Sequence, residues 1–437
     1  MVHALSRTAT NESASFSLPS SANSVPRGYA ATAVLGNALE FYDFVTYAFF
    51  AVFIGQAFFP ASSPSTSLLL SVAVFGVGFI ARPLGGVLVG MYADRVGRRP
   101  AMLWTMWLIT LSTLGLALTP SYAAIGLAAP AAVVAFRLLQ GFAIGGGIGP
   151  TTAFLVESAP LGRRGLFASF QLASQGAAAF VAGVAGIAMH AITTPEQMAS
   201  WGWRVPFLVG LVMIPVALYA RRRLPETLLA PCAKAGTWAG SELHLHRRTI
   251  VLSVFVVAGA TVSTYVVNFM TTYAMTTLKL STGGALSATL ASGLATCVFA
   301  LLGGWLSDRC GRKGVMVWPR AVAALITVPS FMLLVHWPSA VLLVLVASTL
   351  AALTALSAAG SFAAIPELLP AGVRATGLAI AYGLGVCIFG GSTQFVVAWL
   401  TEFMGSPLMP AWYVAGTSLV TLVAMMALPE SNARDRG

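Results

Sequence analysis

Residues 90–99 read GMYADRVGRR, and residues 304–313 read GWLSDRCGRK. The two stretches share a glycine, an aspartate–arginine pair, a second glycine and two closing basic residues at the same spacing. Asp94 and Asp308 stand 214 positions apart, about half the length of the 437-residue chain. A motif repeated at this distance indicates that the chain consists of two related halves.

Two further pairs of motifs support the duplication. Residues 157–164 read ESAPLGRR and residues 367–374 read ELLPAGVR, with a glutamate and an arginine seven positions apart in each. Residues 224–227 read LPET, and residues 428–431 read LPES. The three pairs occur in the same order in both halves, as expected for two parallel repeats of one structural unit.

The composition predicts a membrane protein. Only 8% of the residues are charged, 57% are hydrophobic and the mean hydropathy is +0.84. A soluble chain has about 25% charged residues, because its surface faces water. Lipid instead accepts apolar side chains all round a helix, so the composition indicates helices that cross a bilayer.

Windows of about 20 mostly apolar residues predict twelve spanning helices. They are expected over 28–56, 67–91, 100–119, 124–153, 165–190, 203–220, 249–276, 284–307, 315–335, 338–365, 373–402 and 407–428. The predicted fold is therefore all-α, with two pseudo-symmetric six-helix bundles. We expect a disordered tail over 1–27, bundles over 28–220 and 249–428, a linker over 221–248 and a second tail over 429–437.

The basic residues indicate the orientation in the membrane. With both termini in the cytoplasm, 20 of the 24 Lys and Arg residues fall on the cytoplasmic side, Arg221 and Arg320 among them. The net charge of +11 is then a topology signal and does not predict a nucleic-acid partner. We expect a multi-pass protein of the bacterial inner membrane that works as a monomer.

The sequence indicates neither a cofactor site nor an enzyme. The four cysteines have no paired spacing, and we expect no metal site. No nucleotide-binding loop and no nucleophile motif is recognisable, so an enzyme is not expected. Without a nucleotide-binding loop, any transport by this chain has to be driven by a gradient of a solute or of protons.

The repeated stretch resembles the signature of the major facilitator superfamily, and RLLQG at 137–141 resembles a second motif of that family. GNALEFYDF at 36–44, RPLGG at 82–86 and WGWRVPF at 201–207 are similar to its metabolite:proton symporters, with 39–43 favouring the citrate and tricarballylate members. The resemblance implies proton-coupled uptake of a small organic anion. Uptake of a zwitterion such as proline or betaine is the alternative, and drug efflux is less favoured.

Four ionisable residues clearly lie deep inside predicted spans, all in the first half: Glu40, Asp43, Arg82 and Arg137. Such residues are costly in a bilayer and are candidates for function. We expect Arg137, together with Arg82, to hold a substrate carboxylate, because a guanidinium binds carboxylates in two-pronged geometry. Asp43 or Glu40 is expected to carry the proton. The alternative is a neutral network of two acids and two bases that only joins helices.

Further candidates come from neutral side chains. Asn37, Tyr42, Gln175 and Asn268 are expected substrate contacts, although polar side chains in spans also join helices. The resemblance raises one question about coupling. Many similar proteins have an acidic residue after the RLLQG motif, where this chain has Gly147.

The repeated stretch is expected to act as a gate. We predict that a helix ends at Gly90 and that Asp94 meets the start of span 373–402, while Asp308 meets the start of span 165–190. Such contacts exist only when the halves are closed on the cytoplasmic side, so they favour one of two states. The alternative is a static topology anchor. The expected gating residues are Gly90, Asp94, Arg95, Arg98, Glu157, Asp308, Arg309, Arg312, Glu367 and Arg374.

Overall fold

The computed structural model describes residues 27–60, 70, 74, 76–160, 162–227 and 243–431. Every regular element in this part of the chain is a helix. The predicted tails lie outside the described residues, apart from Arg27 and residues 429–431. The same holds for residues 228–242 of the predicted linker.

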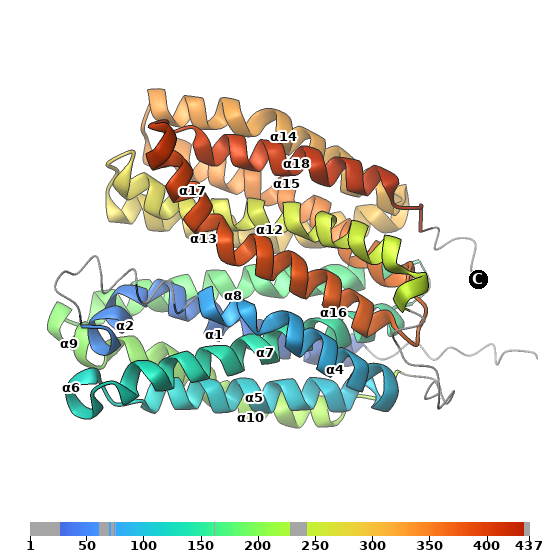
Figure 1. Ribbon diagram of the computed structural model, residues 1–437, viewed down its shortest axis with the longest axis horizontal. Helices are drawn as coiled ribbons and strands as arrows, with labels where there is room; N and C mark the ends of the chain where they lie inside the picture. The colour runs from blue at the N-terminus through green and yellow to red at the C-terminus, as the bar shows by residue number, and fades with distance from the viewer. Residues whose placement is uncertain are drawn as a thin grey trace, which may run out of the picture.

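The first half contains nine labelled α-helices (Figure 1). They are α1 (Arg27–Phe49), α2 (Ala51–Phe58), α4 (Arg82–Val96), α5 (Arg98–Leu118), α6 (Tyr122–Ile125), α7 (Ala128–Glu157), α8 (Arg164–Ile192), α9 (Pro195–Ser200) and α10 (Val205–Arg222). Prolines stand in the first turns of α4, α9 and α10, where a missing N–H costs no helical hydrogen bond.

The second half repeats the arrangement. Its helices are α12 (Arg247–Thr276), α13 (Thr282–Cys310), α14 (Arg312–His336), α15 (Ala340–Glu367), α16 (Arg374–Gly385), α17 (Gly391–Met404) and α18 (Met409–Ala427). A π-helical turn over Val386–Gly390 joins α16 to α17. The two helices therefore form one long span, as the sequence predicted for 373–402.

Among the described residues, eleven helical stretches are long and apolar enough to cross a membrane. The remaining predicted span is α1, whose 23 residues extend over about 34 Å. Asn37, Glu40 and Asp43 lower its hydropathy, but all three side chains are buried inside the protein. A polar helix of this kind is tolerated in a bundle because its polar face is turned away from lipid.

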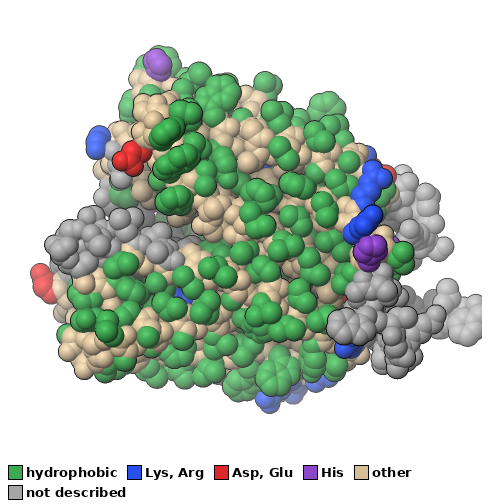
Figure 2. Space-filling model, viewed as in Figure 1, with side chains coloured by type: hydrophobic (Ala, Val, Ile, Leu, Met, Phe, Trp, Pro, Cys, Tyr) green, Lys and Arg blue, Asp and Glu red, His purple; other side chains and the backbone are tan. Residues whose placement is uncertain are grey.

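The two bundles lie side by side with their long helices running in the same general direction (Figure 1). The halves meet where α8 packs on α13 and α4 packs on α16. We call the end where α10 ends and α12 begins the linker end. Apolar side chains cover most of the face shown in Figure 2, and Lys and Arg gather toward the linker end.

The repeated stretch is helical, which corrects the expectation of a loop after Gly90. Helix α4 continues through Gly90 to Val96, and α5 begins at Arg98. Only Gly97 separates them, with φ at 136°, a conformation that glycine adopts without strain. Gly90 instead permits close packing, because a Cβ there would lie 2.9 Å from the Thr376 Cα of the other half.

Candidate functional site

Two buried arginines share one aromatic ring at the centre of the first bundle. The guanidinium carbons of Arg82 and Arg137 lie 4.5 and 5.1 Å from the ring centre of Phe44. Arg82 also lies 4.2 Å from the Phe79 ring, and Arg137 lies 4.2 Å from the Tyr47 ring. Each arginine is only 1% exposed. Aromatic faces attract such cations without neutralising them.

Glycines bring the two arginines together by letting α4 and α7 touch. A Cβ at Gly145 of α7 would lie 2.2 Å from the Arg82 carbonyl oxygen, and one at Gly141 would lie 1.8 Å from the Gly78 carbonyl oxygen. Small residues at such spacing allow the backbones of spanning helices to approach closely. The RLLQG motif therefore supplies both an arginine and the surface that packs beside its partner.

The second half contributes aromatic hydroxyls to this group. The side chain of Arg82 interacts with Tyr265 of α12, whose ring packs edge-on against Phe79 with centroids 5.6 Å apart. Tyr382 of α16 interacts with Gln175 and lies near Arg82. We call this group the central cluster: Phe44, Phe79, Arg82, Arg137, Gln175, Tyr265 and Tyr382. It contains positive charge, aromatic faces and neutral polar groups from both halves.

Glu40 and Asp43 of α1 face α5 and α10. This differs from the network with Arg82 and Arg137 that the sequence analysis expected. Glu40 forms a buried ion pair with Arg221 of α10, at 2.9 Å. Arg221 also donates to the Met102 carbonyl oxygen of α5. The pair thus ties α1, α5 and α10 together. A Cβ at Gly147 would lie 3.0 Å from Glu40 Oε2, so the carboxylate approaches the backbone of α7 at this glycine.

Asp43 lies on the side of α1 that faces α5 and α10. The Thr113 hydroxyl donates to Asp43 Oδ2 at 2.7 Å, while Oδ1 has no hydrogen-bond partner. Gly210 of α10 makes room, because a Cβ there would lie 2.7 Å from Oδ1. The carboxyl group is fully buried. Its neighbour Phe44 points into the central cluster, so α1 carries an acid on one side and the shared ring on another.

The remaining candidates fall into two groups. Asn37 exchanges hydrogen bonds with Gln171 and also donates to Ser174, which ties α1 to α8. The Tyr42 hydroxyl donates to the Pro206 carbonyl oxygen at 3.1 Å. These two residues are engaged in helix contacts. Asn268, by contrast, is exposed on α12 one turn from Tyr265.

Buried charge is not confined to the first half, which corrects the sequence analysis. Arg320 of α14 is fully buried in the second bundle, and Arg221 is fully buried in the first. Both were counted as residues of the cytoplasmic surface. In both cases the position near a helix end does not reveal, from the sequence, that the side chain is buried. Thr113, Phe44 and Phe79 were also missed, because hydroxyls and aromatic rings are common in spans.

The predicted contacts of the repeated aspartates are confirmed. The backbone N–H groups of Ala375 and Thr376 donate to Asp94, at 3.2 and 2.8 Å. Those of Gly165 and Leu166 donate to Asp308, at 2.7 and 2.8 Å. Each aspartate therefore sits at the N-terminus of a helix of the other half, where backbone N–H groups and the helix dipole stabilise an anion.

The three repeated motifs converge at the linker end, which the sequence analysis did not anticipate. Arg98 bridges Asp94 and Glu157, and Arg312 bridges Asp308 and Glu367. The hydroxyls of Thr227 and Ser431 donate to Glu157 and Glu367. We name two groups: the Asp94 cluster (Asp94, Arg98, Glu157, Glu226 and Thr227) and the Asp308 cluster (Asp308, Arg312, Glu367, Glu430 and Ser431). Arg95 is exposed, and Arg309 stacks 4.1 Å from the Trp305 ring.

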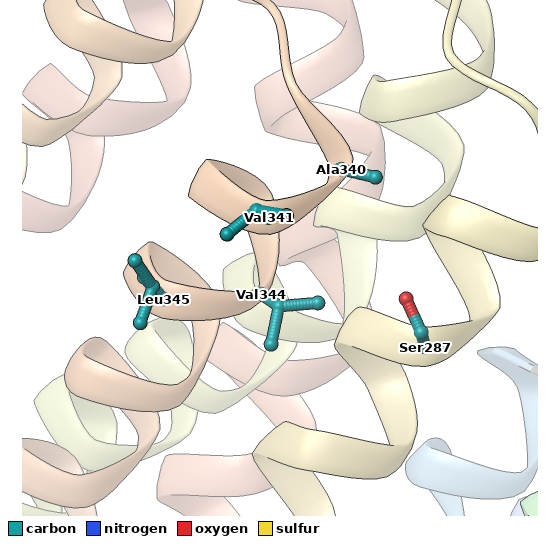
Figure 3. A pocket seen from close by; sticks show the side chains of 5 residues that line it. All are labelled: Ser287, Ala340, Val341, Val344 and Leu345. Carbon is teal, nitrogen blue, oxygen red and sulfur yellow. The ribbon is translucent and has the colours of Figure 1, made fainter.

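A shallow pocket lies apart from these groups. It has a volume of about 230 Å³ and opens between α13 and α15 (Figure 3). Ser287, Ala340, Val341, Val344 and Leu345 line it. The lining is apolar except for one hydroxyl and contains no charge. It therefore offers nothing that would recognise an ionic solute.

The two bundles, their buried ionisable groups and the paired contacts at one end define a membrane transporter of two repeated halves. The sequence matches the model of the Major Facilitator Superfamily over residues 33–388. The chain belongs to this superfamily and is a secondary active transporter, not an enzyme.

Curated relatives cover most of the chain. The citrate-proton symporter of Klebsiella pneumoniae is 34% identical over 402 residues, which cover 91% of this chain and 90% of the relative. The alpha-ketoglutarate permease of Escherichia coli (strain K12) is 33% identical and covers 90% and 91%. A putative proline/betaine transporter of Staphylococcus aureus (strain MSSA476) is 33% identical and covers 91% and 87%.

Solved structures show the same fold. The proton:xylose symporter XylE superposes with a TM-score of 0.77 at 18% identity, covering 93% of this chain and 96% of that one. The human organic anion transporter MFSD10 superposes with a TM-score of 0.66 at 18% identity and covers 91% and 99%. At this level of identity the comparison concerns the fold alone.

Proposed function

We propose that this transporter takes up a small di- or tricarboxylate together with protons. The observation that carries the proposal is the pair of buried guanidinium groups, Arg82 and Arg137, which both lie against the Phe44 ring. Two such groups within reach of one small molecule can each bind a carboxylate in two-pronged geometry. Tyr265 and Tyr382 add hydroxyls from the second half, so one substrate touches both bundles.

The location of the acids favours an anion over a zwitterion. A substrate such as proline or betaine would place its cationic nitrogen beside two guanidinium groups that already lie against the Phe44 and Phe79 rings. Glu40 is engaged with Arg221, and Asp43 with Thr113, both on the side of α1 that faces α5 and α10. The central cluster thus presents net positive charge, which a dicarboxylate balances and a zwitterion does not.

Asp43 is our proposed proton carrier. It is buried, accepts one hydrogen bond and has a second oxygen without a partner, so a proton on that oxygen removes a costly buried charge. Asp43 and Phe44 are consecutive residues on α1. Protonation on one side of this helix can therefore alter its packing against α5 and α10 and shift the ring that Arg82 and Arg137 share.

The relatives support proton-coupled uptake of a carboxylate. Two of them are named for citrate and alpha-ketoglutarate, and the citrate relative is named as a proton symporter. The relative named for proline and betaine keeps the zwitterion as an outcome that has to be tested. We propose further that the chain acts as a monomer in a bacterial inner membrane, with both termini and the linker end in the cytoplasm.

The proposed transport cycle uses the linker-end clusters as a cytoplasmic gate. Asp94 and Asp308 hold the two halves together there, so the arrangement described above is the state closed to the cytoplasm. Substrate and proton binding at the centre would shift the equilibrium toward the state in which these contacts are broken. Alternating access then follows from the movement of one bundle against the other.

Uptake into proteoliposomes with an imposed pH gradient tests the function. The solutes to compare are citrate, tricarballylate, 2-oxoglutarate, proline and betaine, each with and without an uncoupler. We expect accumulation of the carboxylates, loss of accumulation with the uncoupler, and no accumulation of betaine. Accumulation of betaine but of no carboxylate would overturn the proposal.

Matched variants separate the two roles. Asp43→Asn should abolish gradient-driven accumulation while leaving counterflow exchange of labelled substrate. Arg137→Lys and Arg82→Lys should raise KM at least about tenfold, because an ammonium lacks the two-pronged geometry. Leu35→Ala serves as a control within α1, because Leu35 is exposed. If Asp43→Asn keeps a normal response to external pH, the proton is carried elsewhere, and Gly147→Glu becomes the informative variant.

A further inference from the structure

Arg320 is a buried cation outside the central cluster. It lies on α14 and is fully buried. Its Nη1 donates to the Gly259 carbonyl oxygen at 3.2 Å and to Ser263 Oγ at 2.8 Å, both on α12. Its Nε and Nη2 atoms have no hydrogen-bond partner. A guanidinium stays charged even when buried, so this position holds a full positive charge with neutral partners.

No acidic side chain of the second half compensates that charge. Within residues 243–431, all of which the structure describes, the acids are Asp308, Glu367, Glu402 and Glu430. Asp308 and Glu367 pair with Arg312, and Glu430 accepts the backbone N–H of Lys313. Glu402 is exposed on α17. Helix α14 packs on α13, α15 and α18 of its own half.

The first half shows how such a charge is normally balanced. Helices α1, α5 and α10 correspond to α12, α14 and α18 in the repeat, and Arg221 lies buried among the first three. There Glu40 supplies a carboxylate at 2.9 Å. Buried charges are stable only when paired, and an unpaired one in a membrane protein is a candidate for function. Among the described residues of the second half, none supplies the counter-charge for Arg320.

A second buried group without a partner lies on α18. Ser418 Oγ is fully buried and makes no hydrogen bond. It stands one helical turn from Thr421, whose hydroxyl donates to the Phe255 carbonyl oxygen of α12. Thr421 also faces Gly259, because a Cβ at that glycine would overlap its hydroxyl. Since Gly259 is itself a partner of Arg320, Ser418 lies one helical turn from the point where α12, α14 and α18 meet around Arg320.

We propose that Arg320 and Ser418 form a binding site for a small inorganic anion such as chloride. The Nε and Nη2 groups of Arg320 and the hydroxyl of Ser418 would donate hydrogen bonds to the ion. The junction is walled by the small residues Gly259 and Ser263, and Ser263 Oγ already donates to the Gly259 carbonyl oxygen. This site is separate from the central cluster, and its role is to stabilise the second bundle rather than to select the substrate.

The melting temperature of the purified full-length protein tests the site. It is measured in sodium chloride, bromide and gluconate at constant ionic strength. We expect chloride and bromide to raise the melting temperature saturably by at least about 2 °C over gluconate, as ligand binding to the folded state does. Arg320→Gln should remove this rise, and Ser418→Ala should increase the chloride concentration needed for half of it. Arg248→Gln, which alters an exposed arginine of α12, should retain it.

An equal shift in wild type and Arg320→Gln, or no shift in wild type, would overturn the proposal. Bromide also provides a test that needs no variant. In crystals grown with sodium bromide, anomalous scattering should place an ion beside the Arg320 guanidinium and Ser418 Oγ. If Arg320→Gln does not fold, the anomalous map of the wild-type protein tests the site instead. A clear map without a peak beside Arg320 and Ser418 would overturn the proposal.

Discussion

The Asp94 cluster and the Asp308 cluster contain the same motifs but join the two halves in different ways. Asp308 reaches across to two backbone N–H groups, those of Gly165 and Leu166. Asp94 has the equivalent backbone contacts and also accepts from the Thr376 hydroxyl at 2.6 Å. The Asp94 side further has an ion pair across the halves, between Glu157 and Arg374, at 3.1 Å.

The difference comes from two positions of the repeat. Leu166 stands where the other half has Thr376, so one hydroxyl contact has no counterpart. Arg164 corresponds to Arg374, but within the described part of the chain it forms no ion pair. The two clusters thus form different numbers of contacts across the halves. We expect the Asp94 cluster to contribute more than the Asp308 cluster to the stability of the closed state. The predictions below test this inequality.

The largest expected effect is that of removing the repeated carboxylates. Asp94→Asn should weaken the closed state by about 3 kcal/mol, since hydrogen bonds to a charged group contribute roughly 1.5–3 kcal/mol. Asp308→Asn should cost about 1 kcal/mol less, because it loses no hydroxyl contact. Hydrogen exchange of the first turns of α16 and α8, followed by mass spectrometry, reports the opening directly.

Both variants should show faster exchange at both helix starts if the halves separate as units. Arg95→Gln serves as the control, because Arg95 is exposed on the same helix. Equal exchange rates in Asp94→Asn and Asp308→Asn would show that the two clusters stabilise the closed state equally, contrary to our expectation. Faster exchange confined to the helix that lost its own aspartate would indicate local fraying, as a static anchor predicts.

The ion pair across the halves should have the next largest effect. Arg374→Gln removes the ion pair with Glu157. The Arg374 side chain is 20% exposed, and the Glu157 side chain is 11% exposed. Partial exposure reduces the contribution to about 1 kcal/mol, or roughly a fivefold change in the ratio of closed to open protein. Arg164→Gln is the matched control and should change exchange little. A similar response of the two variants would show that Arg164 also stabilises closure.

The gate illustrates what could be predicted from the sequence. The repeat, together with the preference of an acid for a helix N-terminus, predicted that Asp94 and Asp308 would meet helix starts of the opposite half. The backbone path was not predictable in the same detail. A glycine in a polar stretch suggests a loop, whereas Gly90 lies inside α4 and serves the contact with Thr376.

The buried charges show the opposite case. Charge counting treats every arginine near a helix end as a surface residue, so it could not distinguish Arg221 and Arg320 from their neighbours. Their burial depends on side-chain direction, which only the packing of three helices determines. Likewise, the three-residue spacing of Glu40 and Asp43 predicted a shared face, but not that this face is turned toward α5 and α10 rather than toward Arg82.

Exchanging the residues of the repeat should sharpen the comparison. Thr376→Val removes one hydroxyl that donates to Asp94, a loss of about 1 kcal/mol. Leu166→Thr introduces a hydroxyl at the equivalent place beside Asp308 and should stabilise closure by a smaller amount. In the double variant the lost contact at Asp94 and the added contact at Asp308 partly offset each other, so exchange at both helix starts should lie between the rates of the two single variants. No change in Leu166→Thr would mean that its side chain cannot reach Asp308.

The smallest expected effect concerns the glutamates of the third motif. Glu226 accepts the backbone N–H groups of Arg98 and Arg99, whereas Glu430 accepts that of Lys313 alone. Both carboxylates therefore sit at a helix N-terminus of their own half, where an acid contributes about 0.3–1 kcal/mol. Glu226→Gln should lower the melting temperature more than Glu430→Gln, with little effect on closure, because these capped N–H groups belong to the same half as the glutamate that accepts them. Faster exchange at α16 in Glu226→Gln would contradict this expectation. It would show that the cap of α5 also positions Arg98 for its bridge between Asp94 and Glu157, so that the third motif stabilises the closed state.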